Sequence, residues 1–103
     1  MLLASISFRV QPHKLAEALS AVDALVERMR TAEGCTRCRV LSDSDDPNSF
    51  LVASEWSDTT AAEAYFNSRE FQIFKGVRIL MREEPFIVLD DVRARVTRLM
   101  RTS

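Results

Sequence analysis

The residues most able to do chemistry are two cysteines, Cys35 and Cys38, in the segment EGCTRC (33–38). The C-x-x-C spacing is typical of a redox pair that opens a helix, or of one half of a zinc site. A structural zinc site needs four ligands, and His13 is the one histidine of the sequence. We interpret His13 as a solvated residue in a strand-to-helix turn, and we therefore expect no metal site.

Other catalytic signatures are scarce in the sequence. It contains no G-x-S-x-G motif and no glycine-rich phosphate loop. The segment DSDD (43–46) lacks the glycine and the closing glutamate of a calcium loop, so we interpret it as a turn. The acidic pairs at 83–84 and 90–91 are adjacent in sequence, and on a strand they would face opposite ways. We do not expect either pair to share a proton.

A group of aromatic residues in the middle of the chain is the best candidate for a ligand pocket. It comprises Trp56, Tyr65, Phe66, Phe71 and Phe74. Such a group is typical of a hydrophobic core. It can equally wall a small-molecule pocket between a sheet and its helices, with the Tyr65 hydroxyl as the polar group.

The elements that would position these residues follow from the hydrophobic periodicity. Strands are predicted where apolar residues alternate or β-formers gather, and helices where apolar residues recur every three or four positions. The predicted strands are 2–10, 35–42, 50–56 and 86–92, and the predicted helices are 13–32, 59–68 and 69–81. Ser57 or Asp58 is the predicted N-cap of the second helix, and Ser68 that of the third.

This order of elements predicts an α+β protein with a ferredoxin-like βαββαβ sandwich. Four antiparallel strands would form the sheet, and the helices would cover one of its faces. The uncovered face would carry apolar residues from the last strand, Phe86 to Leu89. Because an uncovered apolar face is an association site, we expect a homodimer in which two sheets meet as a dimeric α/β barrel.

We divide the chain into a domain over residues 1–92 and a basic amphipathic C-terminal tail over residues 93–103. The tail has four arginines and no acid. Its apolar residues continue the spacing of Val92 at positions 96, 99 and 100, which predicts a short helix docked on the dimer. A phosphate-binding arm and a disordered segment are the alternatives.

The predicted strand over 35–42 decides the interpretation of the two cysteines. On a regular strand, residues three apart point to opposite faces. Thiols placed in this way neither hold one metal ion nor close an unstrained disulfide. We therefore interpret Cys35 and Cys38 as small apolar fillers, one toward the helices and one toward the dimer side.

Composition excludes several classes of protein. The 103 residues carry a formal net charge of −1, with 47% hydrophobic and 28% charged residues. This balance is typical of a single globular domain and argues against a general nucleic-acid-binding protein. No apolar run reaches the roughly 18 residues of a membrane span. We expect a cytoplasmic protein with reduced thiols and neither a membrane nor a nucleic-acid partner.

Four segments resemble one family. They are E-G-C (33–35), D-D-P-N-S-F (45–50), E-W-S-D (55–58) and the Ser68-x-x-Phe71 spacing. They are similar to the antibiotic biosynthesis monooxygenase family of the dimeric α/β-barrel group, over about residues 2–92. The resemblance implies a face-to-face dimer and a pocket between sheet and helices. It also implies oxidation of electron-rich aromatics or quinols by O2 without a metal, flavin or other cofactor, as several members perform.

The resemblance also suggests roles for individual residues. Tyr65 would hydrogen-bond the substrate oxygen, and Glu70 would act as the base, with Glu55 as the alternative base. Trp56 and Phe74 would wall the pocket. Ile6 on the first strand would be a further substrate-binding position.

The chain departs from the family at several of these positions. Quinol-oxidising members that share the pattern carry histidines where this chain has Tyr65 and Glu70. Haem-degrading relatives use an asparagine, a tryptophan and a histidine at the positions of Ile6, Tyr65 and Lys75. We therefore expect no haem degradation.

The function that combines these observations is a cofactor-independent monooxygenase that acts on a small aromatic or quinol. An isomerase or tautomerase that uses the same pocket is one alternative. A non-catalytic module that binds a small molecule is another, because the family's histidines are missing. We expect an enzyme, with the monooxygenase reaction as the first hypothesis.

Overall fold

The computed structural model of the chain describes residues 1–91 and 96–101, without the side chains of residues 73, 75 and 96–101. The strands are β1 (Leu2–Arg9), β2 (Cys35–Ser42), β3 (Ser49–Trp56), β4 (Phe86–Asp91) and β5 (Val96–Arg101). The α-helices are α1 (Leu15–Arg30), α2 (Thr59–Phe66) and α3 (Arg69–Phe74), and the 3-10 helices are η1 (Pro12–Lys14) and η2 (Lys75–Leu80).

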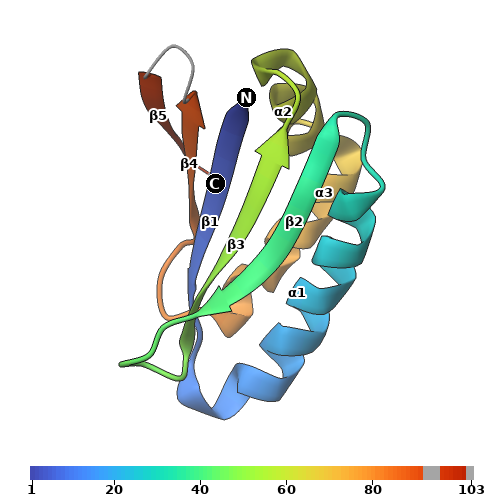
Figure 1. The fold of residues 1–103 in the computed structure, drawn as a ribbon. Coiled ribbons are helices and arrows are strands. Elements are labelled where there is room, and N and C mark those ends of the chain that lie inside the picture. The colour runs from blue at the N-terminus through green and yellow to red at the C-terminus, as the bar shows by residue number, and fades with distance from the viewer. Residues whose placement is uncertain (92–95, 102–103) are drawn as a thin grey trace.

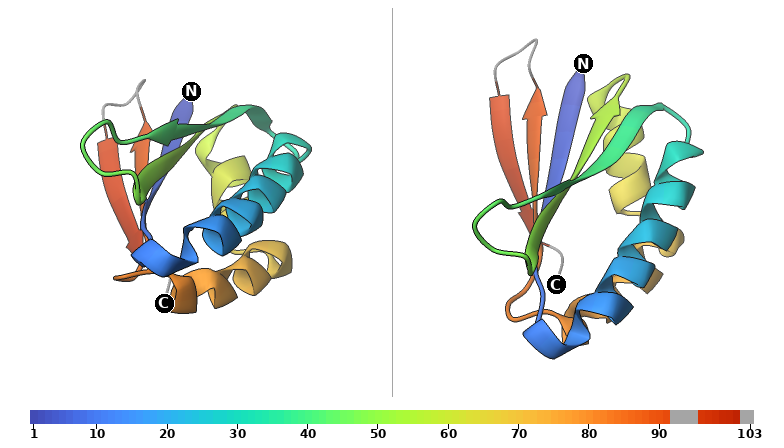
Figure 2. Two further views of the ribbon diagram at one scale, coloured as in Figure 1. Left: turned by 90° about the horizontal axis from the view of Figure 1, so that it is seen from below. Right: turned by 60° about the horizontal axis from the view of Figure 1, so that its bottom comes forward.

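The strands form one antiparallel sheet in the order β2-β3-β1-β4-β5. All of the helices pack on one face of this sheet, and the other face is uncovered (Figures 1 and 2). The first four strands have the ferredoxin-like order that the sequence predicts, so the predicted fold class is confirmed.

The C-terminal segment differs from its prediction. Val96–Arg101 is a strand, β5, which pairs along β4 and extends the sheet beyond the four predicted strands. The prediction of a helix is therefore wrong for these residues, and the part of that prediction at Val92 lies outside the described residues. The apolar spacing of a short segment does not decide between helix and strand when an unpaired strand edge is available to it.

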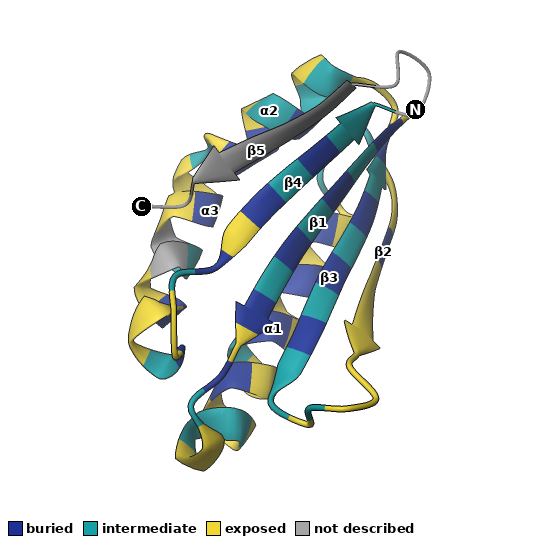
Figure 3. Ribbon diagram, turned by 90° about the vertical axis from the view of Figure 1, so that its left-hand side faces the viewer, coloured by how far each residue is buried: buried dark blue, intermediate teal, exposed yellow. Residues whose placement is uncertain are grey.

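Buried and more exposed residues alternate along the strands, so one face of the sheet is buried and the other is not (Figure 3). In β1, Leu2, Ala4, Ile6 and Phe8 are at most 2% exposed, whereas the residues between them are half-buried. Helix α1 covers the buried face with one stripe of apolar residues, which consists of Ala18, Val22, Leu25, Val26 and Met29. A period of two on the strand and of three to four on the helix is what brings these surfaces together.

Side-chain caps fix where the short helices begin. The carboxylate of Asp58 accepts a hydrogen bond of 2.7 Å from the backbone N–H of Ala61 at the start of α2. The hydroxyl of Ser68 accepts one of 3.2 Å from Phe71 N–H at the start of α3. These contacts confirm the predicted caps, and they satisfy backbone N–H groups in the first turn of each helix.

The turn from α1 into β2 depends on Gly34. This residue has a φ of +86°, a left-handed conformation that L side chains rarely adopt. A Cβ at this position would also collide with the Cβ of Ala61 on α2. The turn and α2 can therefore approach each other only because residue 34 has no side chain.

A β-bulge at the start of β2 changes the orientation of the two cysteines. Cys35 pairs with Trp56 and Cys38 pairs with Ser54, because the register with β3 shifts between Cys35 and Arg37. Trp56 and Ser54 share the helix-covered face of β3, so both cysteines lie on that same face. The prediction that they face opposite sides is therefore wrong, since one extra residue in a strand restores the phase.

Candidate functional site

Tyr65 lies at the centre of an aromatic cluster between the sheet and the helices. Its ring centroid is 5.4 Å from that of Trp56, 5.6 Å from Phe66 and 5.9 Å from Phe71. The residue is 6% exposed, although it lies on a helix of only eight residues. The cluster therefore presents π faces around one buried phenol.

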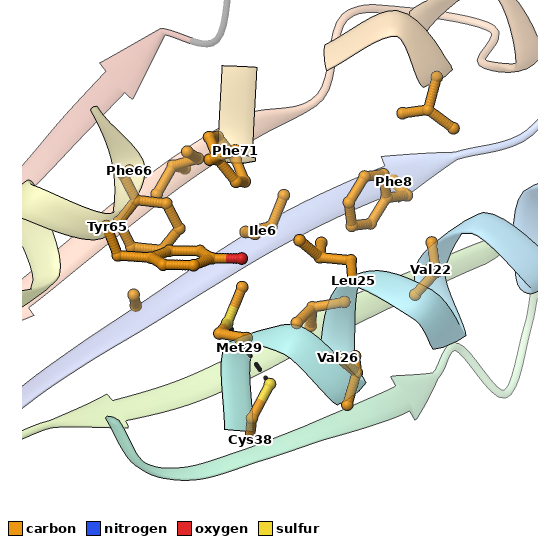
Figure 4. Close-up of a cluster of buried hydrophobic side chains, with 14 of the residues drawn as sticks. Ile6, Phe8, Val22, Leu25, Val26, Met29, Cys38, Tyr65, Phe66 and Phe71 are labelled. Atoms are coloured by element: carbon orange, nitrogen blue, oxygen red, sulfur yellow. Dashed lines mark hydrogen bonds between the residues drawn. The ribbon is translucent and has the colours of Figure 1, made fainter. Parts of the chain in front are cut away.

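The hydroxyl of Tyr65 is buried and has no hydrogen-bond partner among the residues that the structure describes. Figure 4 shows it directed among the apolar side chains of Ile6, Leu25 and Met29. Leaving such a group unsatisfied costs about 1–3 kcal/mol, and buried polar groups nearly always have a partner. Among the described residues, this hydroxyl is therefore a buried polar group whose hydrogen-bonding capacity is unused.

The electrostatic environment keeps this hydroxyl protonated. Burial raises the pKa of Tyr65 far above its usual range, and the negative charge of Glu70 raises it further. The side chain is therefore a neutral phenol at physiological pH. It can donate one hydrogen bond to an oxygen of a ligand and accept another.

Glu70 lies at the rim of the cluster and not inside it. Its carboxylate is 3.9 Å from the Nε of Arg28, and both side chains are substantially exposed. Arg28 lies in the last turn of α1 and Glu70 in the first turn of α3, so the ion pair joins the two helices. The structure thus brings the two predicted catalytic residues into one region, with the hydroxyl buried and the carboxylate in solvent.

The predicted binding residues Ile6, Trp56 and Phe74 belong to the same core. Ile6 and Trp56 are fully buried. The indole N–H of Trp56 donates a 2.8 Å hydrogen bond to the hydroxyl of Ser54, so Trp56 can act as a wall but has no free donor. Phe74 is half-buried and packs edge-on against Phe8, with ring centroids 5.9 Å apart.

Three residues of the cluster were not anticipated as site residues from the sequence. Leu25 and Met29 of α1 lie beside the hydroxyl of Tyr65, and Cys38 of β2 contacts Met29 from the other side (Figure 4). Their apolar character and their periodicity predict burial alone. Only the packing of α1 across the sheet places Leu25 and Met29 beside the hydroxyl of Tyr65.

Glu55, the alternative base, lies away from Tyr65. It is half-buried on the uncovered face of β3, where its carboxylate is 3.9 Å from the Nε of Arg37. Because neighbouring residues on a strand face opposite ways, Glu55 and Trp56 cannot serve the same pocket. Glu55 is therefore not a candidate base for chemistry beside Tyr65.

The uncovered face of the sheet also carries hollows. One of about 480 Å³ is lined by residues that include Ser7, Leu51 and Phe86. Another of about 250 Å³ lies further along the face, beside Leu3 and Ala53. Both are on the side of the sheet away from the aromatic cluster.

Two further properties bear on the class of site. Within residues 1–91 and 96–101, no helix has the length and apolar character to cross a membrane. Across the same ranges, no three side chains of the His, Cys, Asp and Glu types are grouped to hold a metal ion.

Comparison with known proteins gives consistent results. The family model described as antibiotic biosynthesis monooxygenase matches residues 1–76. The chain is 28% identical over 82 residues to the Bacillus subtilis (strain 168) protein named "Putative monooxygenase YcnE", covering 78% of this chain and 86% of that protein.

Solved structures agree in fold. A crystal structure of an antibiotic biosynthesis monooxygenase has a TM-score of 0.80 and 24% identity, covering 89% of this chain and 98% of that chain. The structure of Rv0793 from Mycobacterium tuberculosis has a TM-score of 0.78 and 15% identity, covering 88% of this chain and 94% of that chain. These identities establish the fold alone, whereas the family model matches most of the length of this chain. The chain therefore belongs to the antibiotic biosynthesis monooxygenase family.

Proposed function

We propose that this protein is a cofactor-independent monooxygenase that acts on a small aromatic or quinol bound beside Tyr65. The observation that carries the proposal is the unpaired hydroxyl of Tyr65, buried in an aromatic cluster on the helix-covered face. Membership of a monooxygenase family supports the reaction class. The site supports the substrate class, because a flat ring with an oxygen substituent matches both the π faces and the vacant donor.

The proposed reaction needs no redox group from the protein. A quinol and O2 give a hydroxyquinone and water: one oxygen atom enters the ring, and the other leaves with two hydrogens. All four electrons that O2 takes come from the substrate. The protein contributes by removing water from the substrate, positioning it and moving a proton.

Each named residue has a part in this scheme. Tyr65 donates its proton in a hydrogen bond to the substrate oxygen and orients the ring against Trp56. Glu70 receives the proton that the substrate loses when it becomes an anion. The positive charge of Arg28, 3.9 Å from Glu70, then favours the anionic substrate at the same rim.

Access to Tyr65 passes between α1 and α3 in this proposal. The Arg28–Glu70 ion pair spans these helices, and both groups are exposed. An exposed pair contributes little stability, about 0–1 kcal/mol, so it can part when a ligand enters. We expect ligand binding to quicken at high salt, which screens the pair.

The uncovered face of the sheet supports a homodimer as part of the proposal. It presents half-buried Leu3, Leu51 and Val88 beside the exposed ring of Phe86. The Arg37–Glu55 pair lies on the same face. A face with apolar residues and both signs of charge is self-complementary under a twofold axis. A second copy would bury it, and the pockets would remain on the outer, helical sides.

Oxygen uptake tests the proposed activity. Purified protein is given a panel of quinols and polyphenols, and O2 consumption and product are measured against autoxidation. We expect one O2 consumed per hydroxyquinone formed, and loss of most activity in Tyr65→Phe, while Phe86→Tyr on the far face keeps it. An absence of uptake above autoxidation across the panel would contradict the proposal, and turnover that persists without O2 would indicate the isomerase instead.

A non-catalytic binding module is the second candidate. The observation in its favour is that, in the described part of the core around Tyr65, the remaining titratable side chains are the thiols of Cys35 and Cys38. Such a module would bind the same aromatic ligands without consuming O2. Ligand-induced quenching of Trp56 fluorescence with no turnover would favour it over the enzyme.

A further inference from the structure

Strand β2 forms an edge of the sheet that another strand can extend. In the described part of the chain, β3 is the only strand that pairs with β2. Just past the end of β2, the backbone N–H of Asp43 donates a 3.0 Å hydrogen bond to the carbonyl of Ser49. Backbone groups alternate between the two sides of a strand, so the odd-numbered residues of this stretch bond to β3. Val40 and Ser42 therefore direct their N–H and C=O groups outward.

The edge is covered at one end and open at the other. Arg30 of α1 donates a 3.1 Å hydrogen bond from its Nε to the carbonyl of Cys38, which covers the edge near the start of β2. Further along, Val40 is 36% and Leu41 is 41% exposed, and Figure 3 shows exposed residues along this half of the strand. An open edge with exposed apolar side chains is a template for a further strand.

The charges around Leu41 are arranged symmetrically. Arg39, Leu41 and Asp43 alternate along the chain, and all three line hollows on the uncovered face of the sheet. Within the described residues, neither Arg39 nor Asp43 takes part in an ion pair. A second β2 turned by 180° about Leu41 would bring each Arg39 opposite an Asp43. The segment is therefore complementary to itself in charge.

We propose that β2 pairs antiparallel with β2 of a second copy of this chain, with Leu41 on the twofold axis. In this register Val40 of one copy lies opposite Ser42 of the other, and their outward backbone groups exchange hydrogen bonds. Leu41 meets its counterpart at a close, non-hydrogen-bonded position, flanked by two Arg39–Asp43 pairs. A twofold axis at Val40 or Ser42 would instead place Leu41 opposite a charged residue.

This edge contact is separate from the dimer proposed above. It uses the backbone edge of β2, whereas that dimer uses the face of the sheet around Phe86. A few hydrogen bonds and two exposed ion pairs make an interface smaller than those of stable complexes. The edge contact is therefore transient at micromolar concentration, where light scattering reports the face-to-face dimer. It joins such dimers to each other when the protein is concentrated.

Cysteine trapping tests the edge contact. The whole chain with Cys35→Ser, which removes the half-buried thiol, receives one cysteine at position 40, 41 or 42, and disulfide-linked pairs are measured after mild oxidation. Cα atoms at a non-hydrogen-bonded position are close enough for a disulfide. We expect Leu41→Cys to crosslink at least about tenfold faster than Val40→Cys and Ser42→Cys, whose thiols would lie too far from their own counterparts. Ile79→Cys, at a residue that is 78% exposed on η2, controls for random collision.

A charge swap tests the register in the Leu41→Cys chain. Asp43→Arg places arginines opposite each other and should slow crosslinking by at least about fivefold. Adding Arg39→Asp to the same chain restores opposite charges and should restore the rate. Asp23→Arg makes the same change of charge at an exposed position of α1 and should have no effect. The Oδ1 of Asp43 accepts a 2.8 Å hydrogen bond from the N–H of Asp45, so Arg39→Asp alone repeats the test without altering this turn.

Four results would overturn the proposal. The first is a Leu41→Cys chain that crosslinks no faster than Ile79→Cys. The second is faster crosslinking at position 40 or 42 than at 41, which would indicate another register. The third is a doubly swapped chain that crosslinks as slowly as the single variants. The fourth is loss of the crosslink on adding Phe86→Asp, which would assign the contact to the face-to-face dimer.

Discussion

The two faces of the sheet differ in the polar groups that they carry and in whether those groups are paired. On the helix-covered face, buried apolar side chains surround the hydroxyl of Tyr65, which is unpaired within the described part of the chain. On the uncovered face, half-buried apolar residues alternate with ion pairs such as Arg37–Glu55. In our proposal the first face holds the ligand site and the second is the dimer surface.

Removing a wall of the aromatic cluster should have the largest effect. Trp56→Ala deletes a fully buried indole, so we expect the free energy of unfolding to fall by about 3–5 kcal/mol. Phe86→Ala, on the uncovered face and 44% exposed, should change the stability of the monomer by about 0.5 kcal/mol or less. Chemical denaturation measures both, and similar losses would erase the difference between the faces.

The tight turn at Gly34 should be the next most sensitive point. Gly34→Ala places a Cβ against Ala61 and imposes a φ that alanine disfavours, at a cost of about 1–3 kcal/mol. Gly76→Ala is the matched control, because its Cβ would meet no atom within 4 Å. We expect the control to be neutral or to stabilise by up to about 1 kcal/mol. Thermal unfolding that ranks the two variants equally would contradict this account of the turn.

A charge on the uncovered face should break the proposed dimer without unfolding the chain. Phe86→Asp puts a carboxylate into the surface that a second copy would cover, whereas Ile79→Asp changes a residue that is 78% exposed on η2. Light scattering should show monomers for the first variant and dimers for the second. A monomeric unaltered protein at micromolar concentration would rule out the dimer.

A substitution in the loop between β2 and β3 should change the free energy of unfolding by a smaller amount, and this change should depend on pH. Hydrogen bonds from Arg82, Ser49 and the Asn48 N–H hold the pKa of Asp46 well below its usual range. Because the pKa is lower in the folded state, the stabilisation is complete at neutral pH and is lost as pH falls below about 4, the usual value. Asp46→Asn should therefore be less stable than the unaltered chain at pH 7, and this difference should shrink toward pH 3.

The main elements could be predicted from sequence because their signals are local. Alternation in β1, the apolar stripe of α1 and the caps Asp58 and Ser68 each act within a few residues. The bulge before Arg37 could not be predicted in this way, because it is a property of the pairing between β2 and β3. Strand β5 likewise forms on the edge of β4, and no local pattern reports that edge.

The sequence predicts the aromatic side of the candidate site but not the side formed by α1, because only the first depends on residues that are close in sequence. The aromatic residues near Tyr65 are close in sequence, so their grouping is visible before folding. Met29 and Leu25 come close to the hydroxyl only when α1 packs across the sheet. The rim position of Glu70 depends on its pairing with Arg28, which lies 42 positions earlier in the chain.

We propose that the Tyr65 hydroxyl is kept for a ligand and not for stability. The most direct measurement is the free energy of unfolding of Tyr65→Phe, determined together with its affinity for an aromatic ligand of the unaltered protein. Because no described residue bonds the hydroxyl, we predict a stability that is unchanged or higher by up to about 1–3 kcal/mol, with binding weakened at least tenfold. A destabilised variant that binds the ligand as well as the unaltered protein would contradict the claim.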